Sequence, residues 1–159
     1  MPGTLFVVST PIGNLGDLSE RAIEVLRGVS LILAEDTRHA RILLERHEIG
    51  TRMASYHEHN EARASRGFVA KLLAGESLAL ISDAGTPLLS DPGARLVRAA
   101  IDSEIEVNAV PGASALLAAL VVSGLPADRF TFFGFLPRRG RERSAMLKAV
   151  VDLPHLAVL

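Results

Sequence analysis

The chain has 159 residues, of which 48% are hydrophobic and 22% charged, so it is long enough to bury one core and too short for two complete domains. Its formal net charge of −1 gives no overall attraction for nucleic acid or an acidic membrane, so any RNA contact must come from a local basic patch. The absence of cysteine excludes disulfides and thiolate metal sites.

The beginning of the sequence gives no sign of export or membrane insertion. Met1-Pro2-Gly3-Thr4 lacks the basic and then apolar segments of a secretory signal. No apolar run approaches the roughly eighteen residues that a membrane helix needs. We therefore expect a cytoplasmic protein.

Short continuous apolar runs alternate with helical patterns over residues 1–125. Such runs are typical of strands that are covered on both faces in a parallel sheet, with helices between them. The expected strands are, in chain order, Leu5–Val8, Leu31–Ala34, Thr51–Tyr56, Leu78–Ile81 and Ile105–Ala109.

The expected helices between these strands have recognisable ends. Asp17 is the predicted N-cap of the first helix, with Glu20 completing a capping box and Gly28 ending the helix. In the fourth helix, Asp91 is the predicted N-cap and Pro92 the first helical residue. The other helices are expected at about Thr37–His47, Glu61–Leu73 and Ala113–Ser123, each followed by a glycine, and the fourth helix is expected to turn Leu96, Val97, Ala100 and Ile101 inward.

Five such βα repeats predict an open, doubly wound α/β domain in residues 1–125, with a mainly parallel sheet and helices on both of its faces. After Pro126 the pattern changes to an aromatic strand, Phe130–Phe135, an arginine-rich stretch and a helix at about Glu142–Val151. An apolar run then leads to Leu159. We expect residues 126–159 to be a linker and the truncated start of a second α/β domain.

Three loops at the expected carboxyl edge of the sheet are candidates for ligand binding. The first loop, Ser9–Asp17, has two glycines before a helix but no GxGxxG motif, so taken alone it is better explained as a tight turn. The second loop, Ser82–Gly93, is longer and richer in small residues than a simple connection requires. The third loop, Val110–Ser114, opens a helix. Three such loops at one edge favour a ligand site.

Two polar segments at the same edge contain candidate catalytic groups. Asp36, directly after the second strand, can act as a general base, although capping a helix beside an exposed Arg38 explains it equally well. His57 and His59 follow the third strand, and without a third spaced ligand they give only weak support for a metal. A polar loop that reaches the substrate is the better interpretation, and no metal site is predicted.

A basic cluster stands out in the otherwise neutral chain. Four arginines fall within residues 138–143. Such runs are usually solvated faces or linkers, but arginine also binds phosphate through planar, bidentate contacts. The predicted contacts to an RNA backbone are Arg138, Arg139 and Arg141, and Arg38, which follows the second strand, is a fourth candidate.

Six segments together form a recognisable pattern: Thr10–Leu15, Glu35–Arg38, His57–Glu61, Ser82–Gly93, Pro111–Ala115 and Gly134–Arg138. In this order and spacing they resemble the tetrapyrrole (corrin/porphyrin) methylase superfamily, and in particular those members that methylate ribosomal RNA. The resemblance implies S-adenosylmethionine in a cleft between two α/β domains and a homodimer. It also implies methyl transfer to the ribose 2′-hydroxyl of a cytidine in small-subunit (16S) ribosomal RNA, within the small subunit.

The resemblance also implies where the cofactor binds, whereas it leaves the catalytic base open between Asp36 and His57. Free N–H groups at the helix starts suit the methionine carboxylate, and apolar side chains suit the adenosine. The implied cofactor contacts are Ile12, Gly85, Thr86, Pro87, Leu89, Gly112, Ala113 and Ser114.

Two other functions compete with methylation of RNA. One is a methylase of the same fold that acts on a tetrapyrrole precursor, because a large acidic substrate would also favour arginines. The other is a non-catalytic module that binds S-adenosylmethionine or a nucleotide. The segments Glu35–Arg38 and His57–Glu61 favour the RNA enzyme.

Overall fold

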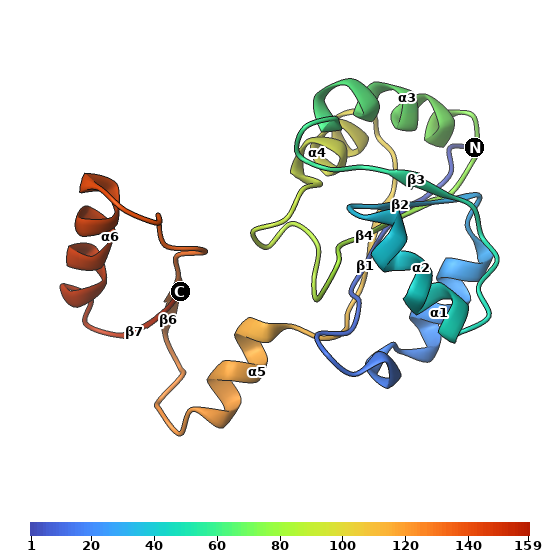
Figure 1. Cartoon of the computed structure of the whole chain (residues 1–159). Coiled ribbons are helices and arrows are strands. Elements are labelled where there is room, and N and C mark those ends of the chain that lie inside the picture. Colours follow the sequence, from blue (N-terminus) through green and yellow to red (C-terminus); the bar gives the residue numbers. More distant parts are fainter. The chain divides into compact units, whose positions relative to one another are not determined.

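The computed structural model describes all 159 residues, and the chain falls into two compact units, Met1–Ser114 and Ala115–Leu159. In the first unit, strands and helices alternate along the chain (Figure 1). Its elements are β1 (Leu5–Val8), η1 (Leu15–Asp17), α1 (Glu20–Gly28), β2 (Leu31–Ala34), α2 (Thr37–Arg46), β3 (Met53–Ser55), α3 (Glu61–Leu73), β4 (Leu78–Ile81), α4 (Ala94–Asp102) and β5 (Val107–Val110).

The five strands of this unit form one parallel sheet in the order β3-β2-β4-β1-β5. β4 lies at the centre and is buried along its whole length, as its continuous apolar run predicts. Leu78 at the start of β4 pairs with Leu5 of β1 and with Leu31 of β2, so the three central strands begin in register. The predicted α/β class with a mainly parallel sheet is confirmed.

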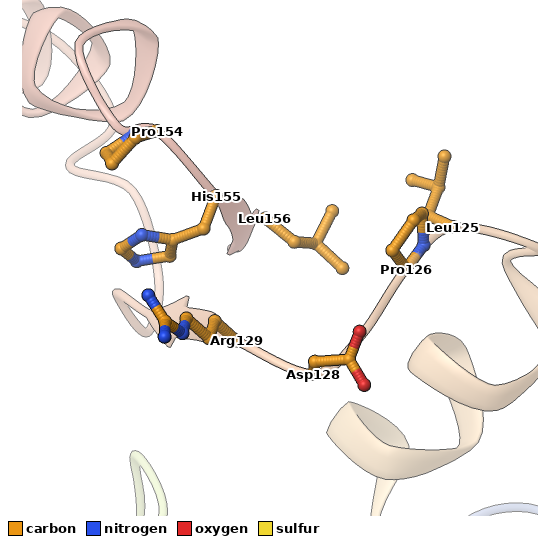
Figure 2. A pocket seen from close by; sticks show the side chains of 7 residues that line it. All are labelled: Leu125, Pro126, Asp128, Arg129, Pro154, His155 and Leu156. Atoms are coloured by element: carbon orange, nitrogen blue, oxygen red, sulfur yellow. The ribbon is translucent and has the colours of Figure 1, made fainter.

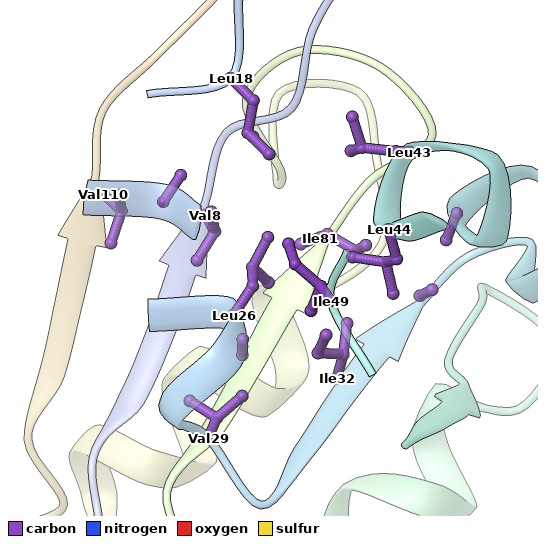
Figure 3. Packing of buried hydrophobic residues seen from close by; sticks show 14 residues of the cluster. Val8, Leu18, Leu26, Val29, Ile32, Leu43, Leu44, Ile49, Ile81 and Val110 are labelled. Atoms are coloured by element: carbon purple, nitrogen blue, oxygen red, sulfur yellow. The ribbon is translucent and has the colours of Figure 1, made fainter. Parts of the chain in front are cut away.

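Two clusters of buried apolar side chains cover the opposite faces of the sheet. Successive residues of a strand point to opposite faces, and along β4 Ala79 and Ile81 belong to one cluster while Leu78 and Leu80 belong to the other. The first cluster takes its helical residues from α1 and α2, and the second takes them from α3 and α4. Figure 3 shows Ile81 among the first cluster, beneath the helices. The sheet is therefore covered by helices on both faces.

The predicted N-cap of the first helix is wrong. α1 is capped by Ser19, whose hydroxyl accepts a hydrogen bond of 3.2 Å from the N–H of Ala22. Asp17 instead ends the short 3-10 turn η1, which Asn14 caps by accepting from the N–H of Gly16. Both Asp17 and Ser19 are good capping residues, and the extra turn moves the start of the helix to the second of them.

The predicted N-cap of the fourth helix is also wrong. α4 begins at Ala94 with Gly93 as its N-cap, so Asp91 and Pro92 remain in the loop. Gly93 has φ of 132°, and a Cβ at this position would lie 2.6 Å from Cδ2 of Leu80. The close packing of this glycine against β4 places the helix start, and an Asp-Pro pair fits a turn as well as a helix cap.

The second unit contains α5 (Ala115–Val122), β6 (Phe130–Phe132), α6 (Arg141–Val151) and β7 (Leu156–Val158). β6 and β7 pair in parallel, with Phe130 opposite Leu156, and α6 connects them. The aromatic strand is shorter than predicted, and the apolar run near Leu159 contains β7. The boundary between the compact units precedes α5, while the domain boundary at residue 125 stays a prediction. None of the helices combines the length and the apolar character needed to cross a membrane.

Two of the residues that were expected to face inward from α4 differ in burial, which corrects one predicted core position and can be tested. Leu96 is fully buried, whereas Ile101 is 54% exposed although it was expected to face inward. We expect Leu96→Ala to lower the free energy of unfolding by about 2–5 kcal/mol because it leaves a cavity. Ile101→Ala should lower it by at most about 1 kcal/mol. Urea unfolding of both variants measures the two losses, and equal losses would contradict the observed orientation of α4.

Candidate functional site

The topology of the sheet leaves a crevice at the carboxyl end of β4. β1 and β2 lead into α1 and α2 on one face, whereas β4, which lies between them, leads into α4 on the other face. The loops after neighbouring strands therefore separate to opposite sides. In open α/β sheets, ligands bind at such a point.

Direct hydrogen bonds join the three candidate loops at this edge. Thr10 and Gly85 form an isolated antiparallel bridge, with N···O distances of 2.9 and 3.1 Å, between the first and second loops. The hydroxyl of Thr86 lies 3.0 Å from the hydroxyl of Ser9 and donates over 3.2 Å to the carbonyl of Ala113 in the third loop. The three loops thus form one connected structure.

The loops approach each other so closely that two glycines are required. Gly85 has φ of 81°, and a Cβ there would lie 3.3 Å from Cγ2 of Ile12. A Cβ on Gly112 would lie 3.0 Å from Cβ of Ser9. Pro87 is buried, Thr86, Ala113 and Ser114 are half-buried, and Ile12, Leu89 and Gly112 are exposed. Some of the predicted cofactor residues are therefore packed against neighbouring loops, whereas Ile12 and Leu89 expose apolar side chains.

The second loop also has a strained backbone. Leu88 and Ser90 have φ of 74° and 68°, in a region that side chains other than glycine adopt at a cost. The end of this loop is held by Glu61, whose carboxylate accepts from the N–H of Gly93 over 3.4 Å and from Nε of Arg95 over 3.0 Å. α4 has no side-chain cap at Gly93, and the Glu61 carboxylate from α3 satisfies the N–H of Gly93 itself.

A cavity of about 380 Å³ lies between the first loop, α2 and the end of β4. The first loop contributes apolar residues that include Ile12, and α2 contributes His39 and Ile42. Ser82 and Asp83 line it at the end of β4. It is a mainly apolar space with polar groups at one side, as small-molecule sites are.

Glu35 belongs to a group of acidic side chains near this cavity, and its pKa is shifted. It was not singled out from the sequence as a candidate. Burial raises the pKa of Glu35, and the neighbouring Asp83 and Asp91 raise it further, whereas His57 lowers it. Burial likewise raises the pKa of Asp91, and Asp83 adds to this effect. Glu35 was visible in the sequence only as an acid at a strand end, because its neighbours come from distant segments.

Asp36, one of the two candidate bases, has a structural role at the start of α2. Its carboxylate caps the helix by accepting from the N–H of Arg38 over 2.8 Å and also forms two bonds with the Arg38 guanidinium. These hydrogen bonds hold the pKa of Asp36 well below its usual range. A carboxylate that binds protons this weakly is a poor general base.

His57, the other candidate base, has an unsatisfied ring nitrogen. Its Nδ1 is buried and has no hydrogen-bond partner, while its backbone N–H donates over 3.0 Å to Oδ1 of Asn60. Its ring centroid lies 5.9 Å from that of His59, in an edge-on arrangement. A buried polar atom without a partner is rare in folded proteins and points to a ligand or a proton-transfer role.

The predicted RNA-contacting arginines occupy two separate regions. Arg38 is exposed in the first unit but paired with Asp36 over 2.8 Å. Arg138, Arg139 and Arg141 are exposed in the second unit, where they precede or begin α6. Their assignment to RNA binding stays a prediction.

The second unit has a hollow of its own, of about 470 Å³, which contains none of the predicted site residues. Figure 2 shows Asp128 and Arg129 on one segment of its lining and His155 and Leu156 on the other. Nε2 of His155 is within 2.8 Å of the Thr131 hydroxyl, so this histidine already has a partner in the unit.

The raised pKa of Glu35 predicts a dependence of stability on pH. The folded state binds the Glu35 proton more tightly than the unfolded chain does, so this carboxyl destabilises the fold increasingly as the pH rises above about 4.5, its ordinary value. We expect Glu35→Gln to raise the melting temperature at pH 7 and to lose this advantage near pH 4. Thermal unfolding across that range measures the difference, and a constant difference would contradict the assigned shift.

Comparison with known proteins agrees with this fold. Residues 4–159 match the model of the family described as Tetrapyrrole (Corrin/Porphyrin) Methylases. Proteins named ribosomal RNA small subunit methyltransferase I are similar: that of Xylella fastidiosa is 54% identical over 99% of this chain and 58% of its own length. That of Escherichia coli O157:H7 is 47% identical over 98% of the chain and 54% of its length. The chain thus spans a little over half the length of these relatives.

Solved structures share the fold at low sequence identity. Uroporphyrin-III-C-methyltransferase from Thermus thermophilus superposes with a TM-score of 0.62 at 20% identity, covering 83% of this chain and 60% of that one. A diphthine synthase gives a TM-score of 0.62 at 18% identity, covering 81% and 51%. From the match of the family model to nearly its whole length, this chain belongs to the tetrapyrrole (corrin/porphyrin) methylase family.

Proposed function

We propose that this chain is part of an S-adenosylmethionine-dependent methyltransferase that methylates the ribose 2′-hydroxyl of a cytidine in small-subunit ribosomal RNA. The names of relatives with 45–54% identity support the substrate. The observation that carries the proposal is the connection of three loops through the Thr10–Gly85 bridge and the Thr86 hydroxyl. We further propose that the protein acts in the cytoplasm as a homodimer on the small subunit.

The residues of the three loops fit S-adenosylmethionine. Gly85 and Gly112 let the three loops pack closely around a ligand, because a Cβ at these positions would press on Ile12 or Ser9 of the first loop. Ile12 and Leu89 are 38% and 46% exposed and offer apolar surface to an adenosine. In this proposal the cofactor contacts are Ile12, Gly85, Thr86, Pro87, Leu89, Gly112, Ala113 and Ser114.

When bound, S-adenosylmethionine supplies an activated methyl group. The chain must therefore align a ribose hydroxyl with it and accept the proton that the hydroxyl loses. Between the two candidate bases, we propose His57, because its Nδ1 has no partner whereas the carboxylate of Asp36 is held by Arg38.

Methyl transfer distinguishes this function from its two competitors. The protein at its natural length is incubated with radiolabelled S-adenosylmethionine and small ribosomal subunits that lack the modification. Label in a 2′-O-methylcytidine supports the proposal. Label in a tetrapyrrole precursor instead supports the small-molecule methylase, and cofactor binding without transfer to either supports a non-catalytic module.

The placement of the cofactor predicts a specific effect at Gly85. Gly85→Val places a side chain at a positive φ against Ile12, a proposed cofactor contact, and we expect the displaced loop to weaken S-adenosylmethionine binding at least about tenfold by calorimetry. Gly75→Val is the matched control, because Gly75 has a similar φ of 93° but lies after α3, outside the three loops. Equal affinities of the two folded variants would contradict this placement.

The arginine cluster is expected to contribute to RNA binding and not to cofactor binding. Replacing Arg138, Arg139 and Arg141 with glutamine should lower the affinity for the small subunit and reduce its dependence on salt, because fewer counterions are released. RNA affinity at two salt concentrations and a cofactor titration measure both effects.

The control replaces three exposed arginines that are scattered along the first unit, Arg46, Arg63 and Arg66. This control removes the same charge without removing the cluster. If both triple variants have the same affinity and the same salt slope, the cluster has no specific role in RNA binding.

A further inference from the structure

The cavity beside the first loop is distinct from the proposed cofactor contacts but adjoins them. Its lining includes Ile12, which the two share, whereas Gly85, Thr86 and the third loop do not line it. A methyltransferase must hold the methyl acceptor beside the donor. Resting on the proposed function, the adjoining cavity is therefore the place for the acceptor.

The size of the cavity limits what can enter it. At about 380 Å³ it lies near the lower end of ligand pockets, which range from roughly 300 to 1,000 Å³. It therefore suits one nucleotide and not a duplex or a large macrocycle. RNA-modifying enzymes reach a buried nucleotide by extruding it from its neighbours, and single unstacked bases are what proteins recognise specifically in RNA.

The walls of the cavity suit the flat faces of a base. Ile12 and Leu15 are each 38% exposed and Ile42 is 59% exposed, and all three line this one space. Large aliphatic side chains clustered at the surface mark a binding site more often than scattered ones do. His39 of α2 adds an aromatic ring on which a base can stack.

Asp83 gives the cavity a group that distinguishes between bases. Its Oδ1 accepts from the backbone N–H of Asp36 over 3.1 Å, which fixes the carboxylate between β2 and β4. Its second oxygen has no hydrogen bond within the chain and can accept one from a ligand. An aspartate accepts from the exocyclic amino group of cytosine, whereas uracil has an oxygen at that position, which the carboxylate repels.

We propose that this cavity binds the extruded target base, between Ile12 and Ile42, and that Asp83 selects cytosine over uracil by accepting a hydrogen bond from its amino group. Selection of the base then depends on Asp83 at the start of the second loop and on α2, while the rest of the second loop and the third loop contact the cofactor.

The test compares small subunits that carry either cytidine or uridine at the nucleotide methylated by the wild-type protein. Asp83→Asn keeps an oxygen that accepts from Asp36 but replaces the free acceptor with an N–H donor, which matches uracil. We expect the ratio of kcat/KM for cytidine over uridine to fall at least about tenfold. Asp102→Asn, the same change at an exposed carboxylate of α4, should leave this ratio unchanged.

Each outcome separates the inference from the function on which it rests. If the wild-type protein transfers methyl but Asp83→Asn retains its cytidine preference, the pocket assignment is wrong and the methyltransferase stands. If the wild-type protein transfers no methyl to RNA, the proposed function itself fails. If Asp83→Asn is inactive on both substrates, its affinities for the cytidine and uridine subunits are measured instead. An affinity ratio equal to that of the wild type overturns the proposal.

Discussion

The bridge between Thr10 and Gly85 is the interaction on which the site depends. β1 and β4 are neighbours in the sheet, but the chain leaves them toward opposite faces, so their loops would otherwise separate. Two backbone hydrogen bonds hold these loops together, and the buried Thr10 hydroxyl adds a bond of 3.1 Å to the carbonyl of Ser82. Because Gly85, the partner of Thr10 in this bridge, has a positive φ, only glycine adopts this backbone conformation without strain.

The strain in the second loop is balanced by contacts at its far end. Two residues with unfavourable backbone angles, Leu88 and Ser90, cost of order 1–3 kcal/mol each unless surrounding contacts enforce them. Glu61 supplies such contacts, because it joins the end of the loop at Gly93 to the start of α3. Tyr56 and Ser65 share a buried hydrogen bond in the same region, so this side of the loop rests on a well-packed layer. The loop is therefore held at both ends, which keeps its strained centre in place.

Local sequence patterns predicted the strands and helices of the first unit. They did not predict where α4 starts or which carboxyl has a raised pKa, because contacts between distant segments determine both. The apolar run Leu78–Ile81 predicts a buried strand because burial on both faces is a property of the run itself. The start of α4 depends instead on the fit of Gly93 against Leu80, which no local pattern contains. For the same reason the sequence marked Asp36 as a candidate base, but the carboxyl with a raised pKa is its neighbour Glu35.

In the proposed function, a chain with a net charge of −1 has to attract RNA through local charge. A weak overall field provides little attraction to the phosphate backbone, so affinity must come from a local cluster such as the exposed arginines of the second unit. Asp83 lines the cavity beside the first loop, and the neighbouring Glu35 and Asp91 add negative charge that disfavours a phosphate there. In the proposed function, the arginines therefore attract the strand, while the cavity reads a single base through hydrogen bonds.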